Sequence, residues 1–200
     1  NDEVIQRIFR WKKGMASQST FSRFFRKFGQ KRNDSLFPTL NRFWFSQLHL
    51  DKMTIDLDST IITRHGNQEG VAKGYNPKRK GRGSHHPLIA FVAEAKMVAN
   101  AWMRSGDTHT NTSFIEFYNE LLRIIPVERI GLFRADSGFC TETIMEAMES
   151  QNARFIVAAR MMGPLVRRIF EHKNWFPIED GYWTASFPYQ AKGWTKPRRM

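Results

Sequence analysis

The stretch Thr54-Ile55-Asp56-Leu57-Asp58-Ser59-Thr60 decides the fold, because it has the pattern of a strand that ends in acidic residues. On the two-residue period of a strand, Asp56 and Asp58 lie on one face and the apolar residues lie on the other. A carboxylate at the end of such a strand is costly unless something offsets its charge, and a bound divalent cation does so well. The stretch therefore predicts a strand that presents a metal-binding acid.

A second stretch has the same character. In Leu132-Phe133-Arg134-Ala135-Asp136-Ser137-Gly138-Phe139, a short apolar run delivers Asp136 at its carboxyl end. An aspartate after a strand is most often a turn former or a helix cap, so Asp136 alone does not indicate a metal site. Its pairing with the Asp58 segment favours a metal site that both acids form.

Lysine and arginine are concentrated in parts of the chain. The formal net charge is +12, and residues 61–86 carry six basic groups against one acid. Residues 87–163, by contrast, carry seven basic groups against nine acids. Basic segments around a slightly acidic core suit a nucleic acid that lies across a carboxylate site. The basic run at residues 78–82 could also be a loop whose charges are simply solvated. The candidate phosphate contacts are Lys78, Arg79, Lys80, Arg82 and Arg134.

The hydrophobic pattern predicts a mixed sheet with helices on its faces. The expected strands cover residues 52–60, 87–94, 97–104, 129–135 and 154–159, and the expected helices cover residues 112–125 and 141–151. Ser113 and Glu116 form an expected capping box, and residues 64–86 have a loop-like composition. Three antiparallel strands followed by strand–helix–strand crossovers are the order of the RNase H-like fold, whose first and fourth strands run side by side.

Three segments make up the expected domain organisation. Residues 1–50 predict a basic helical lead-in, with helical patterns over residues 3–32 and from Pro38 to about Leu48. Residues 51–163 predict the RNase H-like core, and residues 164–200 predict the start of a strand-rich insertion. The chain begins at Asn1 without a methionine, which we interpret as a sign of a fragment.

Composition also excludes several classes of protein. The single cysteine, Cys140, excludes an internal disulfide and a multi-cysteine zinc site, and a reducing cytoplasm is the expected compartment. No apolar run approaches the roughly 20 residues that are needed to span a bilayer, so no membrane partner is expected.

Together these residues resemble the DDE transposases of bacterial insertion sequences, in the group with an RNase H-like catalytic domain. Residues 56–60 (Asp-Leu-Asp-Ser-Thr) are similar to the family's first-aspartate motif, and residues 134–139 (Arg-Ala-Asp-Ser-Gly-Phe) are similar to its second. The likeness covers most of residues 15–200. Other similar segments are Gly66-x-Gln68-Glu69-Gly70, Gly74-Tyr75-Asn76-Pro77-Lys78, His86-Pro87-Leu88 and Arg104-Ser105-Gly106-Asp107-Thr108-His109.

The resemblance implies an activity and a cofactor. Asp58 and Asp136 would bind Mg2+, with Mn2+ as an alternative, and Asp56 competes with Asp58 for the first position. Two divalent cations roughly 3.5–4 Å apart activate a nucleophile and stabilise the leaving oxygen. Water would attack a phosphodiester bond at the end of the mobile DNA element, and the freed 3′-hydroxyl would then attack target DNA. Double-stranded DNA is the implied partner, and a homodimer that bridges two ends in the bacterial cytoplasm, at the nucleoid, is a further expectation.

The chain departs from the family's pattern at the third acid, which is a glutamate on a later helix. Glu171 is too early, and Glu179 lies in what has the pattern of the insertion itself. We therefore expect a truncated chain whose third acid lies beyond Met200. Two alternatives stay open. One is a catalytically inactive, transposase-derived DNA-binding protein, and the other is a metal-dependent nuclease that uses Asp56, Asp58 and Asp136.

Overall fold

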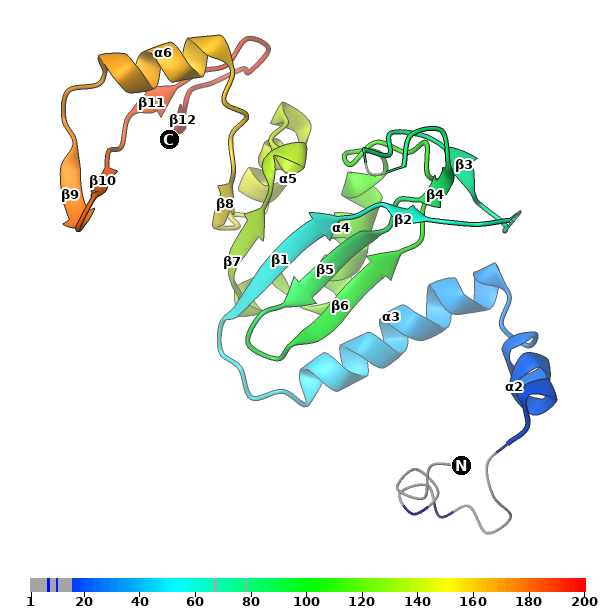
Figure 1. The fold of residues 1–200 in the computed structure, drawn as a ribbon. Helices are drawn as coiled ribbons and strands as arrows, with labels where there is room; N and C mark the ends of the chain where they lie inside the picture. The colour runs from blue at the N-terminus through cyan, green and yellow to red at the C-terminus, as the bar shows by residue number, and fades with distance from the viewer. Residues whose placement is uncertain (1–6, 8–9, 11–15, 67, 78) are drawn as a thin grey trace. The chain divides into compact units, whose positions relative to one another are not determined.

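The computed structural model describes residues 7, 10, 16–66, 68–77 and 79–200 (Figure 1). It divides into two units, residues 1–40 and residues 41–200. The expected three-part organisation at residues 50 and 163 stays a prediction. Most of the helical pattern expected within residues 3–13 lies outside the described residues. Among the described residues, no helix has both the length and the apolar character to cross a membrane.

The helices of the lead-in are α2 (Gln18–Phe25) and α3 (Gln30–Ser46). The Ser17 side chain caps α2 by accepting a hydrogen bond from the Thr20 amide at 3.3 Å. The start expected for α3, at Pro38, was wrong, because the helix begins eight residues earlier and carries Pro38 inside it. A proline in a helix interior forfeits one backbone hydrogen bond, and the remaining bonds of a long helix continue on both sides of it.

Five strands form the central sheet in the order β6-β5-β1-β7-β8. Its first strand pairs antiparallel with β5 and parallel with β7, and β7 pairs parallel with β8. The mixed sheet of the RNase H-like fold, with its first and fourth strands side by side, is therefore confirmed. The strands are β1 (Met53–Ser59), β5 (Leu88–Val92), β6 (Met97–Trp102), β7 (Ile130–Ala135) and β8 (Phe155–Val157).

The helices α4 (Phe114–Ile124) and α5 (Glu142–Ser150) flank this sheet (Figure 1). Their apolar faces are buried with the apolar face of β1, and burial of such side chains supplies most of the stabilisation of a core. Short 3-10 turns, η1 (Val127–Arg129) and η2 (Ser137–Phe139), stand at the two ends of β7. The largest fully buried side chains of the core include Phe45, Ile55, Phe117, Tyr118, Leu121 and Phe133.

The capping box expected at the start of α4 was wrong. Ser113 takes a left-handed conformation with φ of 54°, and its side chain makes no capping hydrogen bond. The preceding loop explains this, because the Arg104 guanidinium binds the carbonyl oxygens of Thr110 and Thr112 and turns the chain just before the helix.

A second, smaller sheet takes two short strands from the segment expected to be a loop, so that prediction was wrong in part. Its antiparallel strands are β2 (Ile62–Thr63), β4 (Gly83–His85) and β3 (Ala72–Lys73), in that order. Gly106 allows the loop after β6 to lie against this sheet, because a Cβ atom there would lie 2.5 Å from the Ala72 carbonyl oxygen.

The C-terminal segment has the strand character that the sequence predicts. It contains α6 (Gly163–Glu171), the hairpin β9 (Phe176–Glu179) and β10 (Tyr182–Thr184), and the pair β11 (Pro188–Tyr189) and β12 (Arg198–Arg199). Arg198 joins this segment to α5 through ion pairs with Glu142 and Glu149.

Candidate functional site

The two acids singled out in the sequence lie next to each other in the sheet. The register of the parallel strands pairs Leu57 of β1 with Ala135 of β7. Asp58 and Asp136 are the next residues along these two strands, and both are exposed. Neighbouring strands are separated by about 4.8 Å, so the two acidic residues meet at the carboxyl ends of β1 and β7.

An ion pair between the residues two positions before the acids indicates that the acids share a face of the sheet. Arg134 donates from Nε to Asp56 Oδ1 at 2.6 Å and from Nη2 to Asp56 Oδ2 at 2.8 Å. Alternate residues of a strand point to the same side. Asp58 and Asp136, each two residues further along, therefore project from the face that carries this ion pair.

The two carboxylates differ in what holds them. Asp136 caps the turn η2, because its Oδ1 accepts a hydrogen bond from the Gly138 amide at 2.9 Å. Among the described residues, no hydrogen bond or ion pair engages the other oxygen of Asp136 or the carboxylate of Asp58. Asp136 is thus both the turn former that its position suggests and a carboxylate with one oxygen free for a ligand.

This donor set fits part of a divalent-cation site. Mg2+ and Mn2+ prefer oxygen ligands, and Asp58 and Asp136 offer three uncommitted carboxylate oxygens from rigid strand ends. The described part of the chain contains no group of three or more His, Cys, Asp or Glu residues that could hold a metal ion. Asp56 does not complete the set, because Arg134 engages both of its oxygens.

A network of hydrogen bonds involves Ser59, the residue that follows Asp58. Ser59 Oγ lies 3.0 Å from Thr110 Oγ1 and 3.2 Å from His86 Nε2. His86 Nδ1 lies 2.6 Å from the Thr108 carbonyl oxygen, which only accepts, so Nδ1 carries the proton and Nε2 accepts from Ser59 in the neutral ring. This network joins Ser59 to the loop that follows β6.

Arg104 organises that loop. The side chain is buried, with 8% exposed, and it donates to the carbonyl oxygens of His86, His109, Thr110 and Thr112. Burial lowers the pKa of its guanidinium. Thr110 in turn lies close to the Asp136 turn, since a Cβ atom added to Gly138 would lie 3.3 Å from Thr110 Cγ2. The loop therefore supports both acid-bearing segments.

Comparison with known protein families identifies the domain. The profile of the family described as "Transposase DDE domain group 1" matches residues 1–200. The chain belongs to this family. The predicted resemblance to DDE transposases is thereby confirmed, while an origin in a bacterial insertion sequence stays a prediction. No curated protein sequence matches this transposase domain.

Solved transposase structures resemble the domain at low sequence identity. A piggyBac transposase synaptic complex with hairpin DNA matches with a TM-score of 0.44 and 13% identity, over 84% of this chain and 36% of that chain. The Mos1 transposase paired-end complex with the left transposon end gives 0.37 and 11%, over 86% and 70%. The Mos1 mariner paired-end complex with Mn gives 0.36 and 12%, over the same shares.

The predicted DNA-binding residues of the transposase domain fall into two places. Arg79, Lys80 and Arg82 are exposed on the turn before β4, and Lys78 lies outside the described residues. Arg134 stands on the acid-bearing face instead, and the pKa of its guanidinium is raised by the hydrogen bonds and charge of Asp56. A DNA contact at these positions stays a prediction.

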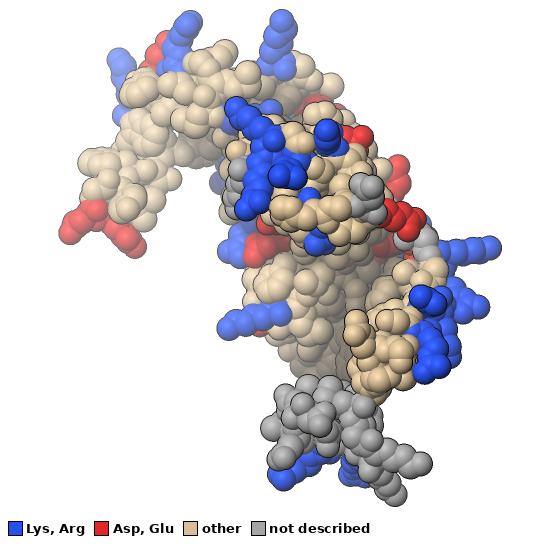
Figure 2. Space-filling model, turned by 45° about the vertical axis from the view of Figure 1, so that its right-hand side comes forward, with Lys and Arg blue, Asp and Glu red and all other residues tan. Residues whose placement is uncertain are grey.

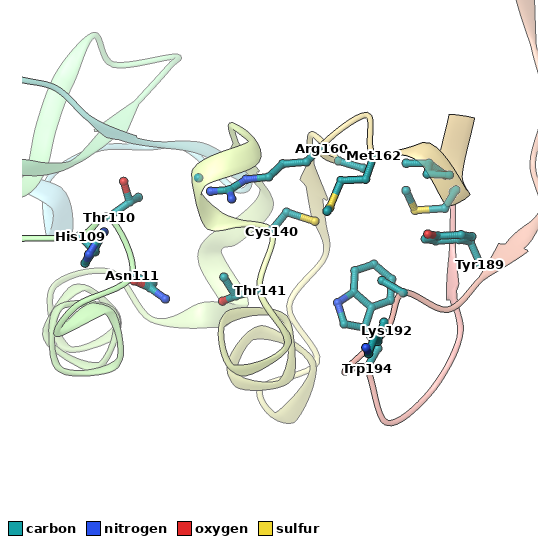
Figure 3. Close-up of a pocket in the computed structure, with 15 residues that line it drawn as sticks. His109, Thr110, Asn111, Cys140, Thr141, Arg160, Met162, Tyr189, Lys192 and Trp194 are labelled. Carbon is teal, nitrogen blue, oxygen red and sulfur yellow. The ribbon is translucent and has the colours of Figure 1, made fainter. Parts of the chain in front are cut away.

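A pocket of about 520 Å³ opens beside the Asp136 turn (Figure 3). Figure 3 shows Thr110 on one side, Tyr189 and Trp194 on the other, and Arg160 between them. The Arg160 Nε donates to the Ser137 carbonyl oxygen at 3.3 Å, which places an exposed cation next to Asp136.

The sequence alone did not indicate the roles of Arg104 and Arg160. Arg160 follows a short strand and has no motif around it. Arg104 stood within a segment similar to the family, but as one residue of a motif and without a role of its own. The available signal was an arginine at the end of a strand that leads into a long polar loop.

Proposed function

We propose that this transposase domain cleaves DNA phosphodiester bonds at the ends of a mobile element and joins the freed ends to target DNA. The observation that carries the proposal is the adjacency of Asp58 and Asp136 on one face at the carboxyl ends of β1 and β7. Membership of the transposase family and a net charge of +12 support the same reading.

The acids would act as ligands of divalent cations. Asp58 and the free oxygen of Asp136 supply two of the carboxylates that hold Mg2+, with Mn2+ as the alternative. When bound, such cations activate the attacking oxygen and stabilise the leaving oxygen of a phosphodiester. The Gly138 amide holds Asp136 in place, and the hydrogen bond between Ser59 and Thr110 fixes the end of β1. Such preorganisation spares the cost of ordering ligands during the reaction.

The DNA substrate would lie across this edge of the sheet. Arg160 stands beside the Asp136 turn, and Lys192 lines the same pocket. A guanidinium binds phosphate oxygens well because its donors form a rigid fork. We assign Arg160 to the phosphate next to the reacting bond, where it would neutralise charge without belonging to the metal site.

Nicking of supercoiled plasmid DNA tests the proposal. The wild-type chain is expected to nick with Mg2+ or Mn2+ and to stop when EDTA removes the metal. Asp58→Asn and Asp136→Asn should each abolish nicking, while duplex DNA binding persists. Nicking that survives both substitutions, or that needs no divalent cation, would overturn the assignment.

A second candidate function is DNA binding without catalysis. The observation in its favour is that the described residues contain no set of three metal ligands. In that case DNA binding would fall steeply with salt and would not respond to a divalent cation. The nuclease that uses Asp56 together with the other two acids is disfavoured, because Arg134 occupies both oxygens of Asp56.

A further inference from the structure

The small sheet carries a cleft lined by cations from separate parts of the chain. The cleft has a volume of about 460 Å³. Arg64 follows β2, Lys73 ends β3, and Lys80 and Arg82 stand on the turn before β4. Figure 2 shows lysine and arginine side chains gathered over this end of the sheet. We call these four residues the basic cleft.

The first cation of the basic cleft is held by a buried histidine. Arg64 donates from Nε to His85 Nδ1 at 3.2 Å, and its amide bonds the Gly83 carbonyl oxygen at 2.9 Å. His85 is buried, and because its Nδ1 accepts from Arg64, its Nε2 is the nitrogen that donates to the Glu69 carbonyl oxygen at 2.9 Å. The hydrogen bond to His85 holds the Arg64 side chain where it lines the cleft.

A buried asparagine holds the turn that carries two other cations. Asn76 is 4% exposed, donates to Thr63 Oγ1 at 2.9 Å and accepts from the Arg79 amide at 2.9 Å. The Arg82 amide then bonds the Arg79 carbonyl oxygen at 3.2 Å, and Gly81 provides the positive φ of 76° that this turn needs. The turn is therefore fastened to β2 and does not hang free.

Among the described residues, no acid forms an ion pair with any of the four cations of the basic cleft. Residues 61–86 contain one acid, Glu69, and its backbone carbonyl is the part that faces His85. Four unneutralised cations around one concavity form an anion site, and the glycines that line it let a phosphate approach the backbone closely.

The basic cleft is also tied to the acid-bearing end of the central sheet. Arg64 comes six positions after Asp58, so their Cα atoms are at most about 22 Å apart. Glycine packing makes the connection firm, because a Cβ on Gly106, in the loop next to Arg104, would collide with the Ala72 carbonyl oxygen. Since duplex DNA rises about 3.4 Å per base pair, Arg64 lies within roughly six base pairs of Asp58.

We propose that the basic cleft binds the phosphate backbone of duplex DNA beside the bond to be cut and so sets the position of the duplex over Asp58 and Asp136. The proposal rests on the proposed function for its DNA substrate and adds the binding site. Successive phosphates along one strand match a row of cations, whereas contacts to phosphate carry no information about sequence. The cleft therefore positions DNA without selecting it.

Lysine protection tests the site without altering it. The Asp58→Asn, Asp136→Asn double variant is mixed with a short duplex of mixed sequence and then treated by reductive methylation, so that cutting plays no part. Lys73 and Lys80 are expected to be protected by DNA. Lys96, at the turn between β5 and β6 at the opposite end of the central sheet, should stay reactive. Equal reactivity of Lys73 and Lys80 with and without DNA would overturn the proposal.

Charge-removing variants give an independent measure. Lys80→Gln and Arg82→Gln should each lower the slope of log K against log salt by about one, the value for one lost phosphate contact. Lys96→Gln is the control, because Lys96 is exposed at the turn between β5 and β6 and does not line the cleft. An equal loss of slope in Lys96→Gln would mean diffuse attraction and would contradict a defined site.

The two proposals can fail separately. If the cleft variants bind DNA like the wild type while Asp58→Asn no longer nicks, the proposed chemistry stands and the cleft is overturned. If the cleft variants lose DNA affinity while Asp58→Asn still nicks, the cleft stands and the metal site falls.

Discussion

Arg134 of β7 holds Asp56 of β1 in a two-point ion pair, with nitrogen–oxygen distances of 2.6 and 2.8 Å. The pair joins neighbouring parallel strands two residues before Asp58 and Asp136, which carry the proposed chemistry. It removes Asp56 from competition for a cation, because both of its oxygens accept from the guanidinium. It also fixes the face of the sheet from which Asp58 and Asp136 project.

Asp56→Asn is therefore expected to keep metal-dependent nicking. Both residues of the pair are partly exposed, so the free energy of unfolding should change little. Asp58→Asn, on the same strand and the same face, should lower the nicking rate at least about a hundredfold, since a cation ligand supplies several kcal/mol of charge stabilisation. Plasmid nicking and urea unfolding of both variants check this. Equal activity in the two variants would contradict the assignment of Asp58.

Gly138→Ala tests the support of the second acid. A Cβ atom there would lie 3.0 Å from Asp136 Oδ1 and 3.3 Å from Thr110 Cγ2, so the carboxylate must shift. We expect nicking to fall roughly tenfold or more, because small misplacements of a reacting group cost large factors in rate. Raising the Mg2+ concentration should restore part of the rate.

Gly163→Ala is the control for that substitution, since nothing lies within 4 Å of a Cβ atom at this position. If both alanine variants nick like the wild type, the position of the Asp136 carboxylate does not limit the reaction.

The central sheet could be predicted because its strands have clear chemical patterns. Buried and exposed residues alternate along β1, and β5 and β6 are apolar runs joined by a short turn. The small sheet could not be predicted, because strands of two or three residues contain no measurable period. Its stability depends on contacts between distant segments, such as Asn76 with Thr63 and Gly106 with Ala72.

The site was predictable only in its acids. Asp58 and Asp136 each follow an apolar run, which is a local signal. Arg104 acts on carbonyl oxygens up to eight residues further along and on His86, eighteen residues earlier, and such partners are set by the tertiary fold. The capping box at Ser113 failed for the same reason, because a tertiary contact overrode a local preference.

Tyr118→Phe is expected to stabilise the domain. The Tyr118 hydroxyl is buried beside Phe114 and Phe133 and has no hydrogen-bond partner within the described residues. Removal of an unsatisfied buried hydroxyl should raise the free energy of unfolding by about 1 kcal/mol, measured by urea denaturation. Tyr182→Phe, at an exposed tyrosine, should leave it unchanged. A destabilised Tyr118→Phe would show that the hydroxyl makes a favourable contact.

The same tyrosine should also make stability depend on pH. Burial raises the pKa of Tyr118 from 10.0 to about 12, so the folded protein holds this proton more tightly than the unfolded chain does. Its contribution to the free energy of unfolding is complete below pH 10 and is lost as the pH rises from 10 towards about 12. Urea denaturation across this range should show a decline in the wild type that is smaller in Tyr118→Phe. Parallel declines in the two proteins would contradict it.

Acid should release the C-terminal segment from α5. Arg198 and Thr195 bind Glu142, and the hydrogen bonds from Arg198 in particular lower the pKa of this carboxyl from 4.5 to about 2. A depressed pKa stabilises the folded state above the unfolded value, and this contribution is lost as the pH falls from about 4.5 towards about 2. Hydrogen exchange of residues 187–200 across this range should therefore accelerate in the wild type. In Glu142→Gln it should be fast already at neutral pH, whereas Glu171→Gln on α6 should follow the wild type.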